Sequence, residues 1–160
     1  MALPPLPTPA PSSQIYFCNR EDIETLWSAT DVLSSVDDDT SGTLSPAEEA
    51  LIDDAILRAA NQMMAYLALR YDAQSLMGNP WCKQTSAALA AYLLATRRGD
   101  PAPTQLIELN TIALANLESI RTGALTIPSA YESRDQLPTL TNYTPILGHD
   151  PVILPRNLTR

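Results

Sequence analysis

The placement of proline divides this chain into three parts. The sequence contains 14 prolines in 160 residues, and most of them lie in residues 1–14 and 128–160. Proline fixes its own φ angle, lacks an amide donor and disfavours helix in the residue before it. We therefore expect an extended proline-rich arm at each end, over residues 1–14 and 128–160, around a core of residues 15–127.

The core has the apolar spacing of α-helices. Its clearest run repeats every three to four residues, through Ile52, Ile56, Ala59, Met63 and Leu67, which is the period of a helix with one buried face. The core is long enough for a single modest hydrophobic interior. The sequence thus predicts a mainly α fold, a small helical bundle of three to four helices with extended proline-rich N- and C-terminal arms.

Capping residues predict where the first two long helical segments begin. Asn19, with Asp22 three residues later, has the spacing of a capping box and predicts a first helix ending near residues 27–29. Residues 30–36 are a candidate short helix. Ser45 fits an N-cap followed by a first-turn proline and by Glu48 at the third helical position, so the main helix should run from there to about residue 70.

The next helix should be the central one. It opens at residues 79–80 and closes at residues 97–99, and residues 84–96 carry no charge and are rich in alanine. A helix without a polar face is expected to be contacted on nearly every side. A last helix is expected from about residue 103 to residue 122, and residues 125–127 then alternate like a short strand.

Charge and cysteine content narrow the classes of partner. The net charge of -8 argues against direct nucleic-acid binding, which needs clustered Lys and Arg. No apolar run approaches the roughly 18 residues of a membrane span, and the proline-broken N-terminus lacks the basic region of a signal peptide. Cys18 and Cys82 fit neither a metal-ligand spacing nor a disulfide framework, and we expect buried thiols.

Enzymatic activity is not expected. The single histidine, His149, stands in the C-terminal arm, and there is neither a nucleophile-elbow motif nor a phosphate-binding glycine loop. Arg97, Arg98 and Arg121 lie near predicted helix C-termini, where they can pair with carbonyl groups and the helix dipole. The alternative is that they face acidic surfaces of neighbouring copies.

Residues 37–48 fit the twelve-position EF-hand calcium loop. The candidate ligands occupy the first, third, fifth, seventh and twelfth positions, and they are Asp37, Asp39, Ser41, Thr43 and Glu48. Calcium needs six or more oxygen ligands, and this spacing wraps oxygens around one point. The same residues also fit an ordinary acidic turn, with Glu48 as a helix-capping residue. EF-hand loops usually come in pairs and no second loop is present in the sequence, so both interpretations remain open.

The C-terminal arm is too apolar for a segment that prefers water. Its candidate partner-binding residues are Tyr143, Ile146, Val152, Ile153 and Leu154. The three consecutive apolar residues lie between two prolines and suit an extended strand against another chain. The arm could instead fold back over its own bundle.

Five segments of the core, taken in order, form a recognisable pattern over residues 15–128. They are a Tyr-containing stretch with a short acidic helix (15–23), an acidic loop (37–42), an Ala/Tyr/Leu-Arg-Tyr element (64–71), a small-residue helix ending in Arg-Arg (87–98) and an Arg-x-Gly element (120–128). In the order and spacing of these segments, the core resembles the head–tail adaptor (connector) proteins of tailed bacteriophages, specifically the Mu-like family.

This resemblance implies a structural protein of the virion neck, made in the host cytoplasm. Members form a ring, usually dodecameric, between the portal protein and the tail or its terminator, and the ring extends the channel through which DNA passes without specific binding. No cofactor is implied. The alternative function is a calcium-binding, EF-hand-like regulatory module, whose loop would switch the angle between two helices.

Overall fold

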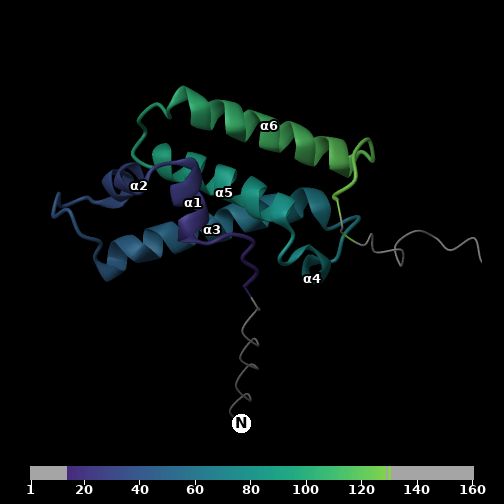
Figure 1. Ribbon diagram of the computed structural model, residues 1–160, viewed down its shortest axis with the longest axis horizontal. Coiled ribbons are helices and arrows are strands. Elements are labelled where there is room, and N and C mark those ends of the chain that lie inside the picture. The colour runs from purple at the N-terminus through teal and green to yellow at the C-terminus, as the bar shows by residue number, and fades with distance from the viewer. Residues whose placement is uncertain (1–13, 129, 131–160) are drawn as a thin grey trace, which may run out of the picture.

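The computed structural model describes residues 14–128 and 130 (Figure 1). In this part of the chain, capping side chains set where most helices begin. The helices are α1 (Arg20–Leu26), α2 (Ala29–Val36), α3 (Pro46–Leu67), α4 (Ala73–Leu76), α5 (Pro80–Ala95) and α6 (Thr104–Arg121). Five N-cap side chains accept hydrogen bonds from first-turn amides, and they are Asn19, Ser28, Ser45, Asp72 and Asn79. Only α6 begins without a side-chain cap.

The mainly α bundle predicted from the sequence is confirmed. The four main helices predicted from the sequence are present as α1, α3, α5 and α6, and residues 30–36 fall within α2. The single-turn helix α4 was not predicted.

The short strand predicted at residues 125–127 is wrong, because that segment has no strand. Its Ile127 amide instead donates to the Tyr71 hydroxyl, at 3.1 Å. A side chain thus satisfies the amide that a neighbouring strand would have paired.

Helix α5 lies at the centre of the bundle, as its uncharged sequence predicted. It packs against α1, α2, α3 and α6, and Figure 1 shows it running between α3 and α6. The run of residues 85–91 is buried without interruption. Small side chains make this possible, because alanine lets four neighbouring helices approach one helix closely.

The end of α6 is tied to the α3–α5 connection by polar contacts. Arg70 Nη1 donates to the Ile120 carbonyl at 2.7 Å, and Asn79 Nδ2 donates to the Pro128 carbonyl, also at 2.7 Å. Gly123 ends the helix with φ +86°, and a Cβ there would lie 3.3 Å from Arg70 Nη1. Ile127 is buried and Ala130 packs on the core, so the contacts of the bundle continue past residue 127.

The two arms, for which the sequence predicts an extended conformation, lie almost entirely outside the described residues. Residues 1–13, 129 and 131–160 are not described. Within the described helices, none is both long and apolar enough to cross a membrane.

Candidate functional site

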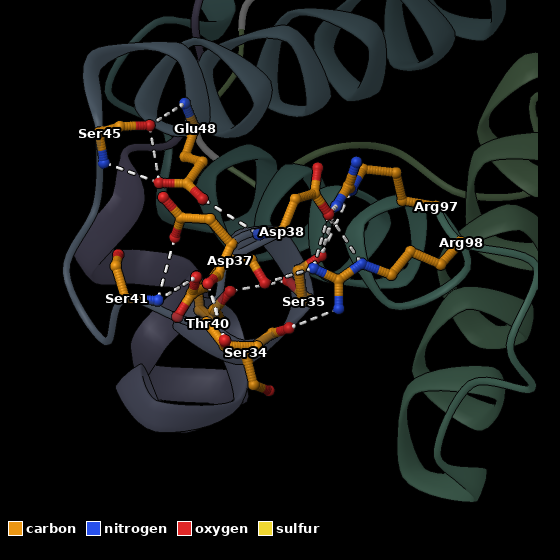
Figure 2. Close-up of polar contacts among 12 residues, drawn as sticks. Ser34, Ser35, Asp37, Asp38, Thr40, Ser41, Ser45, Glu48, Arg97 and Arg98 are labelled. Atoms are coloured by element: carbon orange, nitrogen blue, oxygen red, sulfur yellow. Dashed lines mark hydrogen bonds and ion pairs between the residues drawn. The ribbon is translucent and has the colours of Figure 1, made fainter.

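The acidic loop joins α2 to α3 and is organised by hydrogen bonds from its own backbone (Figure 2). The Asp37 carboxylate accepts from the amides of Ser41, at 3.0 Å, and Gly42, at 2.9 Å. Ser41 also donates its amide to Asp39 Oδ1 at 3.0 Å. These contacts fold the chain tightly around the first acidic residue, and Gly42 has φ +74° at the sharpest bend.

Four of the five residues predicted as calcium ligands lie in this loop, and the fifth, Glu48, lies in the first turn of α3. Carboxylate oxygens of Asp37, Asp39 and Glu48 lie within 4.8 Å of one another. Ser41 Oγ lies 2.8 Å from the Thr43 carbonyl oxygen, to which it donates. The donor set is therefore composed of the hard oxygen ligands that calcium takes.

Glu48 is already engaged as a helix cap. Its Oε1 accepts from the Asp38 amide at 3.0 Å, and its Oε2 accepts from both the amide and the hydroxyl of Ser45 at 2.7 Å. A carboxylate offers about four acceptor sites, so roughly one remains. Glu48 can thus give one oxygen to a cation, whereas a bidentate role would require it to lose a capping bond.

Local contacts favour the charged form of three carboxylates, those of Asp37, Asp38 and Glu48. The Ser45 amide, followed by the Ser45 hydroxyl, keeps the pKa of Glu48 below its usual value. The Gly42 amide does the same for the pKa of Asp37, and the guanidinium groups of Arg97 and then Arg98 lower the pKa of Asp38. Hydrogen bonds and the two guanidinium groups thus offset part of the repulsion between Asp37, Asp38 and Glu48.

Two arginines at the C-terminal end of α5 clamp the loop to the centre of the bundle. Arg97 Nη2 and Arg98 Nη2 both bind Asp38 Oδ1, at 2.5 and 2.7 Å. Arg97 also donates to the Ser35 carbonyl, and Arg98 donates to the carbonyls of Ser34 and Asp37. Figure 2 shows both guanidinium groups reaching across to the end of α2.

This clamp satisfies carbonyl groups that the C-terminus of α2 would otherwise leave unpaired. The sequence predicts carbonyl partners for the arginines at the helix ends where they stand. The partners belong to a different helix, and the role of Asp38 was missed. The signal was present in the sequence as an Arg-Arg pair at one helix end and an Asp-Asp-Asp run after another. Arg121 instead pairs with Glu118 on its own helix.

The predicted partner-binding residues cannot be placed in this site. Tyr143, Ile146, Val152, Ile153 and Leu154 all lie outside the described residues. Their role stays a prediction.

Comparison with known proteins finds one family. The profile described as Bacteriophage Mu, Gp36 matches residues 17–142, which includes all six helices and the loop clamped by Arg97 and Arg98. No curated protein and no solved structure matches the chain. The match covers most of the chain and continues past the bundle into the C-terminal arm, and the chain therefore belongs to the Bacteriophage Mu Gp36 family.

Proposed function

We propose that this protein is a structural adaptor of a phage virion neck. In this role it forms a dodecameric ring between the portal protein and the tail, extends the DNA channel and docks the tail or its terminator. The family match over residues 17–142 is the observation that carries the proposal. It supports a phage protein of the Mu type, and the adaptor role is the finer step that we add.

The charge of the chain suits a channel through which DNA moves. The net charge of -8 repels phosphates, so a wall made of such subunits lets DNA slide instead of holding it. The exposed acidic side chains at the start of α3 contribute to this charge, and they include Glu49, Asp53 and Asp54. DNA is thus a passing molecule in this proposal and not a bound ligand.

The arms suit assembly. In the sequence, the proline-rich N-terminal residues and the apolar C-terminal residues flank the segments that form the helices. Contacts with neighbouring subunits, the portal or the tail would offset the entropy lost when such segments become ordered. We assign these contacts to the residues predicted from the sequence, Tyr143, Ile146, Val152, Ile153 and Leu154.

The rival function, a calcium-gated regulatory module, requires the angle between α2 and α3 to change with the ion. The arginine clamp opposes such a change, because Arg97 and Arg98 tie the end of α2 to α5 through Asp38 and three carbonyl groups. If calcium binds to Asp37, Asp39 and Glu48, it would act as a static clip that stiffens the turn before α3.

Light scattering and negative-stain microscopy of the purified full-length protein, with and without calcium, test the proposal. We expect rings whose mass does not respond to calcium. A phage lacking the gene should accumulate filled heads and complete tails that do not join, and expression of the protein should restore joining. Calcium-dependent monomers, or joined particles without the protein, would contradict the adaptor role.

A further inference from the structure

A groove without charged side chains runs between α5 and α6. Its α5 wall includes Trp81 and Ala88, its α6 wall includes Leu109 and Ile112, and Gln84 and Asn116 supply amide groups. Ile112 is 57% exposed, although it is a large aliphatic side chain. The cavity volume is about 150 Å³, a size that accommodates a benzene-sized apolar group, so it can take one large aliphatic side chain.

The C-terminal arm begins beside one end of this groove. The Pro128 carbonyl is held by Asn79, and Asn79 is the N-cap of α5, whose side chain also accepts from the Trp81 amide at 2.9 Å. The chain therefore leaves the described bundle next to the residue that starts the groove's α5 wall. Within a ring of identical subunits, the arm of each copy would depart close to such a groove.

The arm carries a segment of matching chemistry. Residues 151–155 are Pro-Val-Ile-Leu-Pro, and they are uncharged and apolar like the groove. Flanking prolines limit the conformations that the segment must give up on binding, and extended proline-containing segments commonly bind aromatic-lined grooves. Trp81 supplies an aromatic wall here, and Gln84 and Asn116 can pair with an extended backbone.

The arm is long enough to bind the groove of another copy. Residues 131–151 separate Ala130 from Val152, and a chain of that length spans roughly 25 Å as a coil and about 65 Å when fully extended as polyproline II. Helix α3, with its 22 residues, is about 33 Å long. The arm is therefore long enough to reach the groove of a neighbouring copy.

We propose that residues 151–155 of one copy bind in the α5–α6 groove of a neighbouring copy, with Ile153 directed at Ile112 and Trp81. This inference rests on the ring of the proposed function, because it needs a neighbour. It adds the docking site, the occupant and the direction of the contact. Each subunit then carries one groove and one arm, which is the head-to-tail arrangement that closes into a ring.

Disulfide trapping in the full-length chain tests the contact. The double variant Ile112→Cys/Ile153→Cys is oxidised mildly at micromolar concentration and analysed on non-reducing gels and by mass spectrometry. We expect a ladder of covalent multimers, whereas each single variant can give dimers at most. The native thiols should not compete, because Cys18 and Cys82 are buried and burial raises the pKa of Cys82 to about 11.

The matched control is Ile107→Cys/Ile153→Cys. Ile107 lies on the same helix and is 44% exposed, but it does not line the groove. Docking gives the groove pair an effective concentration on the order of millimolar, so its ladder should form at least about tenfold faster. Equal rates in the two variants, or the absence of a ladder, would overturn the inference.

Two further outcomes separate this inference from the adaptor role. A cross-link within single chains would place the arm in its own groove and refute the contact between copies. Light scattering of the reduced double variant reports assembly independently. Rings without a ladder would refute the groove assignment and leave the adaptor proposal standing. If the ladder forms, but phage heads and tails also join when the protein is missing, the adaptor role alone is refuted.

Discussion

Replacing Ala91 with aspartate tests the central position of α5. Ala91 is fully buried, at 0% exposure, in the helix that packs against α1, α2, α3 and α6. A carboxyl group at this position is not hydrated, and burial can raise its pKa by 3–5 units above the usual value of about 3.9. At pH 7 the chain must therefore bind a proton in order to fold.

The loss in free energy of unfolding comes mainly from binding that proton. Protonating a group of pKa about 3.9 at pH 7 costs about 4 kcal/mol at 1.36 kcal/mol per unit. Burying the neutral acid without a full set of partners adds about 1–3 kcal/mol. The total of about 5–7 kcal/mol compares with the roughly 5–15 kcal/mol by which domains are stable, so Ala91→Asp should leave the protein unfolded or nearly so at pH 7.

Urea unfolding followed by circular dichroism measures this effect, and pH identifies its cause. Because the folded-state pKa of the new acid is raised, its penalty is smallest near pH 4 and grows by about 1.4 kcal/mol per pH unit above that. The midpoint of Ala91→Asp should rise from pH 7 to pH 5, while that of the isosteric Ala91→Asn should not. Ala88→Asp should cost less, because Ala88 is 5% exposed and borders the groove.

Ala115→Asp is the control, since Ala115 is exposed on α6 and the change should cost no more than the helix-propensity difference of about 0.7 kcal/mol. The reasoning would be refuted if Ala91→Asp and Ala115→Asp unfolded at the same urea concentration, or if acidification did not distinguish Asp from Asn at position 91.

Four other outcomes are expected. The folded-state pKa values of Asp37, Asp38 and Glu48 are lowered, so the stability that these groups contribute is complete above about pH 4 and is lost as the pH falls further. Thermal melts should show Asp38→Asn to be less stable than the wild type at pH 7, and its melting temperature should fall less on acidification. Asp53→Asn should follow the wild type. Titration calorimetry with calcium should give heat that Asp37→Ala removes if the loop is a clip, and no heat in the wild type would leave Glu48 with its capping role alone. Tyr71→Phe should lower the free energy of unfolding by about 1–2 kcal/mol, because the buried Ile127 amide loses its acceptor, and an unchanged urea midpoint would contradict this. Deleting residues 131–160 should leave helicity and the melting temperature nearly unchanged but abolish the joining of phage heads to tails. A loss of helical signal would show that the arm belongs to the core.

Local sequence determined the helices of this protein. Each capping signal acts within one helical turn: Asn19 with Asp22 and Ser45 with Glu48 form the capping boxes that their spacing predicts. The uncharged stretch of α5 likewise predicted its central place, because a helix without a polar face must be covered on all sides. The candidate calcium ligands lie close together because all of them come from one stretch of twelve residues, 37–48.

Only the tertiary structure decided which distant groups meet. Asp38 is separated from Arg97 and Arg98 by the whole of α3, α4 and α5, and nothing in the local pattern chose Asp38 over its two acidic neighbours as their partner. The same holds for the Tyr71 hydroxyl, which accepts from Ile127 where a strand was predicted, and for the groove that α5 and α6 leave open beside Ile112. Such contacts depend on how the helices pack, which is settled by the fit of whole buried surfaces, and no short stretch of sequence contains that information.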